Sequence, residues 1–351
     1  LKDYAPDVAA GVAETQGLIP GTPEFDTEVQ RIVDLFPDQI VSRTGWQEKD
    51  LVDYNTRNVR VGGALHYRFG NQMEAFVQGN FARGNSVYTA QNRFSLRNFD
   101  ITNLRAEIKS PDFYVRAYHT IDNSGDTYDA GGAALQLNES WKSSEVWYEE
   151  YITAFGQQLL TGNPEESSHQ FARLVADNRD LKGNIFDPSK PALPLVGSDE
   201  FNNSYQQIIN TPVKQGGAKV IDKISLLHIE GMYNFTRIVK VVELIAGASA
   251  RYYAINSEGT VFIDEPGKPV RIQQYGAFTQ VSKQLFSDHL KITASARYDK
   301  NENFEGRFTP RASVVLSLGE DLLHNIRTSA QTAFRFPSIA DQMVNLNIGP
   351  Y

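Results

Sequence analysis

Cysteine is absent from the 351-residue chain, which excludes a disulfide framework, a thiolate metal site and a cysteine nucleophile. Long apolar runs are absent too. The longest, residues 238–250, is too short for a transmembrane helix and contains Lys240 and Glu243. Cationic residues are the minority, with 34 Lys and Arg against 42 Asp and Glu, so the formal net charge is −8. A chain of this charge matches a phosphate backbone poorly, and we expect no nucleic-acid partner.

Motifs of the common enzyme classes are also missing. The sequence has no GxSxG elbow, Walker A loop, HExxH pair or GxGxxG turn followed by a helix. Its six histidines are scattered, without a pair at the helical spacing of metal ligands. Asp122, Asp126 and Asp129 lie close together, but their spacing misses the EF-hand pattern and favours polar turn chemistry over a calcium site. We therefore predict no enzyme activity, no metal and no cofactor.

The composition that remains suits a folded, β-rich protein. Hydrophobic residues make up 41% and charged residues 22%, which argues against wholesale disorder. The length predicts about two domains or one large all-β unit. The chain begins with leucine, shows no signal peptide, and ends abruptly at NLNIGPY. We expect it to be a fragment of a longer protein.

Strict alternation of apolar and polar residues is the clearest local signal. In residues 290–299 the apolar and polar side chains alternate without a break, which predicts a strand with one apolar and one polar face. The same period predicts nine further strands, most of them longer than the usual strand of a soluble sheet. The full predicted set is 58–69, 73–84, 98–109, 113–121, 223–235, 241–253, 271–285, 290–299, 306–318 and 325–335.

The connections between these strands alternate in length. Five are short turns, at 70–72, 110–112, 236–240, 286–289 and 319–324, and between them lie 85–97, 122–222, 254–270 and the short, polar 300–305. Short turns at one rim and mostly long loops at the other are typical of an antiparallel transmembrane β-barrel, as are aromatic residues near the strand ends. A soluble β-sandwich also alternates in this way, although it has no reason to sort its loops by rim.

Two segments depart from the strand pattern. Residues 141–160 carry an apolar stripe at helical spacing, and the run Asn-Pro-Glu-Glu at 163–166 opens a second predicted helix. A short helix is also predicted near residues 24–35. The expected organisation is an outer loop region at 1–56, four strands in 57–121, a partly helical outer insert at 122–222, six strands in 223–335, and the start of a further outer loop at 336–351.

Charged residues recur on the polar faces of the predicted strands. In a barrel they would line the lumen, because arginine at mid-membrane on the lipid face would cost about 2–4 kcal/mol. There, arginine can pair with carboxylates, or the wall can be merely hydrated with ion pairs of little energy. The residues are Arg105, Glu107, Arg116, Glu230, Arg251, Arg297, Arg311, Arg327 and Arg335.

Aromatic residues of the insert are the candidates for ligand contact. Trp141, Trp147 and Tyr151 could stack on a sugar or ring, or pack the insert against its neighbours. The helical stripe favours packing for Tyr148 and Phe155, whereas both roles stay open for the two tryptophans.

Several runs resemble one protein family, in the order that the family has them. The most specific are RYDKNENFEGRFTPRASVVLS at 297–317 and HNIRTSAQTAFRFPSIADQ at 324–342. The others are ALHYRF (64–69), SVYTAQNRFSL (86–96), FYVRAYHTIDNSGDTYD (113–129), NSEGTVFID (256–264) and YGAFTQVSKQLF (275–286). From about Trp46 to Gln342, the chain resembles the barrel of TonB-dependent outer-membrane receptors, in the branch that often carries a carboxypeptidase-like N-terminal extension.

This resemblance implies a 22-stranded barrel plugged by an N-terminal domain, and active import driven by the proton-motive force through TonB. We recognise neither plug nor TonB-binding segment here, and the ten strands correspond to the middle of the barrel. The expected location is the outer membrane, crossed many times. Expected partners are the TonB complex, the plug, membrane lipid or lipopolysaccharide, and a surface lipoprotein lid. The alternatives are a passive porin-like channel and a surface-exposed soluble β-rich binding protein or adhesin.

Overall fold

A computed structural model describes residues 1–90, 92–319 and 321–345. The described residues form two compact units. A helical unit comprises residues 1–53, 129–211 and 215–218, and a β-sheet unit comprises residues 54–128, 212–214 and those from 219 onward. No helix in the described ranges is both long and apolar enough to cross a bilayer.

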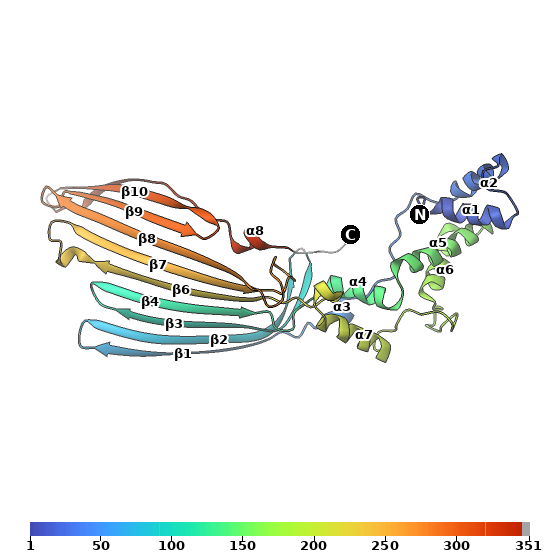
Figure 1. Ribbon diagram of the computed structural model, residues 1–351, viewed down its shortest axis with the longest axis horizontal. Coiled ribbons are helices and arrows are strands. Elements are labelled where there is room, and N and C mark those ends of the chain that lie inside the picture. Colours follow the sequence, from blue (N-terminus) through green and yellow to red (C-terminus); the bar gives the residue numbers. More distant parts are fainter. Residues whose placement is uncertain (91, 320, 346–351) are drawn as a thin grey trace. The chain divides into compact units, whose positions relative to one another are not determined.

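The β-sheet unit is one antiparallel sheet whose strands follow each other in chain order (Figure 1). Its path is β1 (Arg57–Phe69), β2 (Met73–Thr89), β3 (Arg93–Lys109), β4 (Phe113–Asn123), β6 (Lys223–Asn234), β7 (Glu243–Asn256), β8 (Val270–Leu285), β9 (Leu290–Asn301), β10 (Phe304–Leu318) and β11 (His324–Gln331). The two-residue β5 (Tyr128–Asp129) lies off this path. Each of the ten predicted strands is confirmed, because sustained alternation of apolar and polar residues favours a strand over other structures.

The predicted loop at 85–97 is wrong. β2 and β3 stay paired as far as Thr89 opposite Arg93, so most of this segment is a strand hairpin with a register shift between Gly84 and Ser86. The β-forming residues Val87, Tyr88 and Thr89 continue the ladder beyond Gly84. Gln91 lies outside the described residues. Two smaller differences are that β11 ends at Gln331 rather than 335, and that the connection after β9 shrinks to residues 302–303.

The strand register separates the sheet into two unlike faces. One row of directly opposed residues is Leu65, Val77, Ala106, Ala117, Ile229, Ala250 and Tyr275. The neighbouring row, which points the other way, is Gln78, Arg105, Tyr118, His228, Arg251, Gln274 and Asn301. On the first face Leu65 is 71% exposed and Val77 55% exposed. Soluble monomers rarely expose an apolar face this broad, which is typical of a surface that contacts a membrane or another protein.

The helical unit contains α1 (Ala5–Thr15), α2 (Pro23–Val33), α3 (Glu48–Leu51), α4 (Ala130–Trp141), α5 (Ser144–Leu160), α6 (Glu165–Asp177) and α7 (Asp199–Asn210). Helices were predicted at 141–160, after 163–166 and near 24–35, and all three are present. The first begins later than predicted, because Trp141 closes α4 and the Ser143 hydroxyl accepts the amide of Val146 as the cap of α5. A short α8 (Ile339–Met343) belongs to the sheet unit.

Helix α1 was not predicted. Its buried residues are Ala5, Ala9 and Ala13, which repeat every four residues along one face. This spacing is a helical signal, but alanine is a weak marker of burial, and larger apolar residues dominated the pattern elsewhere.

Candidate functional site

The charged face of the sheet is the candidate functional surface. Glu107 on β3 lies directly opposite Arg116 on β4, which lies opposite Glu230 on β6. Arg116 and Glu230 form an ion pair, and the Nη2 atom of Arg105 lies 2.7 Å from the Oε2 atom of Glu107. The four charges therefore form a continuous row across three strands, which the period-two pattern had predicted as a shared face.

The remaining predicted charges lie on other parts of this face or beyond it. Arg297 on β9 lies opposite Thr309, and Arg311 on β10 lies opposite Ser295. Arg327 on β11 lies opposite Val315, which shares the face of Arg311. Arg335 follows the end of β11 and so has no strand register. That this face lines a lumen stays a proposal.

A polar pocket of about 370 Å³ lies on the charged face across β7 to β10. Arg297 forks onto Asp299, with Nε 2.7 Å from Oδ2 and Nη2 2.7 Å from Oδ1. Arg251 and Arg335 also line the pocket, as do the rings of Phe334 and Phe336 (the full lining is Ser249, Arg251, Gln274, Tyr275, Gly276, Arg297, Asp299, Lys300, Thr309 and residues 331–336). Cations, hydroxyls and rings thus meet in one small concavity.

Gly276 makes room for the ion pair inside this pocket. A Cβ atom at this position would lie 2.5 Å from the Nη2 atom of Arg297, 2.6 Å from the Oδ1 atom of Asp299 and 3.0 Å from the Oγ atom of Ser249. Glycine within a strand pattern often indicates such a close approach, and this signal was present in the sequence but not used. The pocket therefore needs a bare backbone at Gly276.

Hollows on the opposite face have a different character. One of them, of about 650 Å³, has an almost wholly apolar lining that includes Leu65, Val77 and Leu104. It contains no convergent polar groups that would fix the orientation of a ligand. We interpret these hollows as the uneven surface of a lipid-facing wall.

The three aromatic candidates for ligand contact are buried in the helical unit. Trp141 is 9% exposed, Trp147 is 0% and Tyr151 is 1%. The rings of Trp147 and Tyr151 stack at 5.1 Å between centroids, with 14° between their planes, and the hydroxyl of Tyr151 contacts Nδ1 of His169. Because their faces are covered by protein, the structure supports packing for all three, and a ligand contact stays an untested prediction.

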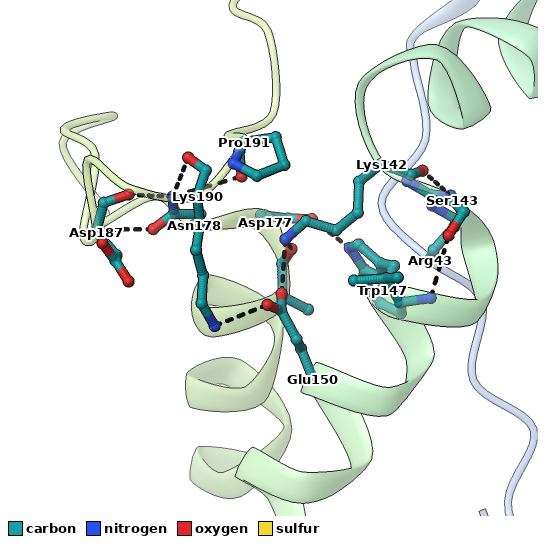
Figure 2. A network of polar contacts seen from close by, with 12 residues as sticks. Arg43, Lys142, Ser143, Trp147, Glu150, Asp177, Asn178, Asp187, Lys190 and Pro191 are labelled. Atoms are coloured by element: carbon teal, nitrogen blue, oxygen red, sulfur yellow. Dashed lines mark hydrogen bonds and ion pairs between the residues drawn. The ribbon is translucent and has the colours of Figure 1, made fainter.

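Polar side chains fasten the end of α6 to α5 around this core (Figure 2). The indole Nε1 of Trp147 donates to the Oδ1 of Asp177 at 2.8 Å, and the Nζ of Lys142 donates to the Oε2 of Glu150 at 2.6 Å. Lys190 donates to the other oxygen of Glu150 at 2.8 Å. Burial acts to raise the pKa of Glu150, but the hydrogen bonds from the two lysines outweigh it and hold the pKa below its usual range.

Asn178 organises the loop that follows α6. It adopts a left-handed conformation with φ of 52° and ends the helix. Its Nδ2 atom donates to the carbonyl of Asp187 at 2.8 Å and to that of Lys190 at 3.0 Å, while its Oδ1 atom accepts the amide of Asp187 at 2.8 Å (Figure 2). These bonds give a fixed shape to a long loop that has no regular structure of its own.

Two of the three aspartates at 122–129 are engaged by neighbouring protein groups. Asp126 accepts a hydrogen bond from Asn98 and pairs with Lys219, and Asp129 caps α4 by accepting the amide of Gly131. Burial raises the pKa of Asp222, which precedes β6, to about 6, with Asp122 and Asp264 adding to the effect. Within the residues that the structure describes, no three metal-ligating side chains are grouped to hold an ion.

An antiparallel sheet of long strands with one lipid-compatible face and one charged face is typical of the wall of a transmembrane β-barrel. The family model of TonB-dependent receptor-like β-barrels matches residues 25–350, and the chain therefore belongs to that family. The family predicted from the sequence motifs is thus confirmed. It is a family of outer-membrane receptors and transporters rather than of enzymes.

Solved structures with a similar fold include siderophore receptors. The siderophore receptor PirA from Pseudomonas aeruginosa has 11% identity and a TM-score of 0.44, over 81% of this chain and 34% of that one. PirA from Acinetobacter baumannii has 10% identity and a TM-score of 0.40, over 80% and 34%. A mutant of the ferric enterobactin receptor PfeA from Pseudomonas aeruginosa has 14% identity and a TM-score of 0.38, over 79% and 34%. The chain spans about a third of the length of these receptors, and no curated protein matches it.

Proposed function

We propose that this chain is part of an outer-membrane transporter that imports a scarce ligand, energised by the proton-motive force through TonB. The main support is the sheet itself, which presents an exposed apolar face to lipid and a continuous charged row on the other side. Membership of the receptor barrel family over residues 25–350 supports active uptake over passive diffusion. The partners in this proposal are TonB, a plug domain, outer-membrane lipid or lipopolysaccharide, and a surface lipoprotein.

Cellular uptake by the full-length protein separates the active transporter from a passive channel. Cells that express it should accumulate the ligand, and removal of TonB should reduce accumulation at least tenfold, because the plug would no longer be displaced. The control is the same deletion strain with TonB restored, in which accumulation should return. Equal accumulation with and without TonB would instead identify a porin-like channel. Recovery of the protein in the soluble fraction, without detergent, would support a soluble binding protein or adhesin.

Strand parity supports one topology for the connections. Turns 70–72, 110–112, 235–242, 286–289 and 319–323 share one rim, and the connections at 90–92, 124–222, 257–269 and 302–303 share the other. Periplasmic turns of such barrels are short, so the rim with 124–222 would face outward. By the same parity, residues 1–56 and those after β11 would lie on the rim that carries 124–222. We propose that every segment on that rim is extracellular.

Protease added to intact cells tests this topology. It should cut the outer loop between α6 and α7, where Leu181 is 90% exposed, and leave the turn at 110–112 intact. In cells with a permeabilised outer membrane the turn should become accessible as well, which is the matched control. Cleavage at 110–112 in intact cells, with the loop protected, would reverse the assignment.

A further inference from the structure

The pocket on β7 to β10 has an unusual local charge. Three arginines line it, Arg251, Arg297 and Arg335, against the single carboxylate of Asp299. Lys300 also borders the pocket, but it lies opposite Tyr275 in the row of the apolar face, and its Nζ donates to the carbonyl of Phe304 at 2.6 Å. The formal charge of the lining on the charged face is therefore 3 − 1 = +2, on a chain whose total is −8. Elsewhere on this face cations alternate with carboxylates, as in the row from Arg105 to Glu230. An excess of positive charge confined to a small concavity favours an anionic occupant.

The pairing of these side chains leaves two guanidinium groups uncompensated. Asp299 is held by the fork of Arg297. Arg251 donates its Nε to the Nδ1 of His228 at 2.9 Å, a neutral acceptor that leaves the charge of the guanidinium in place. Among the described residues, neither Arg251 nor Arg335 forms an ion pair with a carboxylate. The carboxylate of Asp341 interacts with Arg335 only through longer-range electrostatic attraction.

Two further features prepare the pocket for a ligand. The Oγ1 atom of Thr309 is buried and has no hydrogen-bond partner, although it belongs to a residue of the pocket wall. A buried hydroxyl without a partner is costly unless something in the pocket supplies one. Gly276 keeps the space beside Arg297 and Asp299 open, since even a Cβ atom there would clash with both.

Aromatic rings form another part of the wall. Phe334 and Phe336 flank Arg335 in the sequence, and their rings meet edge to face, 5.0 Å apart at 77°. Phe336 also stacks on Phe304 at 5.8 Å, which holds it in place. A planar ring of a ligand could pack against this surface while its charged group reaches the guanidiniums.

We propose that this pocket binds a small organic anion that carries a carboxylate on an aromatic ring. Guanidinium groups bind carboxylates bidentately, and the volume of about 370 Å³ lies in the range of small-molecule sites. The proposal names the ligand chemistry of the charged face and so rests on that face lining a lumen. It does not require energised uptake, because binding to the purified receptor is measured without TonB.

Ligand-observed NMR on the full-length receptor in detergent tests the proposal with three probes. Benzoate has both the ring and the charge, benzyl alcohol has the ring alone, and cyclohexanecarboxylate has the charge without an aromatic ring. Benzoate should bind at least tenfold more tightly than benzyl alcohol and severalfold more tightly than cyclohexanecarboxylate. Equal binding of benzoate and benzyl alcohol, or no binding of benzoate, would overturn the proposal.

Substitutions locate the binding in the pocket. Arg251→Gln and Arg335→Gln should each weaken benzoate binding at least tenfold, and Gly276→Ala should weaken it without changing any charge. Arg327→Gln is the matched control, because Arg327 lies on the same face but does not line the pocket. Unchanged binding in both pocket arginine variants, or an equal loss in Arg327→Gln, would overturn the assignment. Heat-modified mobility on gels shows that each variant has folded into a barrel.

Discussion

Replacing Ala294 with arginine in the full-length protein is expected to weaken its folding into a bilayer by about 2–4 kcal/mol. Ala294 lies opposite Val281 on β8 and Ala312 on β10, in the middle of the apolar face. A guanidinium at this position would have to enter the hydrocarbon, because the strand register holds it away from the charged face. The measurement is denaturant-dependent folding into lipid vesicles, followed by tryptophan fluorescence.

The matched control is Gln280→Arg. Gln280 is the chain neighbour of Val281, so it lies at nearly the same depth, but it pairs with Ser295 and points to the charged face. This variant should change the folding free energy by less than about 1 kcal/mol, since the new charge stays in water. Equal effects of the two substitutions would contradict the assignment of the two faces.

Replacing Trp147 with alanine is expected to destabilise the helical unit by about 3–5 kcal/mol. The indole is fully buried, stacks on Tyr151, and donates its Nε1 hydrogen to Asp177. The substitution therefore removes a large apolar group and leaves a carboxylate oxygen of Asp177 without its partner. Hydrogen exchange of the amides of α5 in the full-length protein measures the loss.

Two variants separate packing from a role in ligand contact. Trp147→Phe keeps most of the buried area and should cost about 1–2 kcal/mol, because the hydrogen bond to Asp177 is lost. Val146→Ala changes the exposed neighbour on the same helix and should have little effect. Normal protection of α5 in Trp147→Ala, together with lost ligand uptake, would restore the prediction that Trp147 stacks on ligand.

The strands could be predicted from the sequence because each one carries its own signal. Alternation over residues 290–299 identifies β9 without knowledge of its neighbours, and the same holds for the rest of the sheet. The strand residues of the hairpin that joins β2 and β3 were assigned to a loop, because the extent of a hairpin depends on pairing across its two strands, which the sequence of either strand does not show. The break between α4 and α5 was missed because an apolar stripe continues across it while the Ser143 cap interrupts the backbone.

The candidate site was only partly predictable, because part of it depends on contacts between segments that are distant in the sequence. Periodicity alone puts Glu107, Arg116 and Glu230 on one face, and the ion pairs follow from the register. The pocket also needs residues 331–336, which follow the end of β11, and nothing in their sequence indicates which strands they meet. Whether Trp147 faces ligand or protein could not be decided either, because aromatic residues serve both roles and burial is a property of the folded unit.

The long β2–β3 hairpin has a consequence for the mechanics of the barrel mouth. Each of these strands has 17 residues, whereas about 9–11 tilted residues suffice to cross a bilayer. The surplus of about 6 residues per strand amounts to roughly 20 Å of strand beyond the hydrocarbon core, since a strand rises about 3.3 Å per residue. A ribbon of two hydrogen-bonded strands of that length bends far less than a loop. If the charged face lines the barrel lumen as proposed, the entrance on this side is bordered by a stiff ribbon, and an arriving molecule would have to pass over it because the ribbon does not move aside.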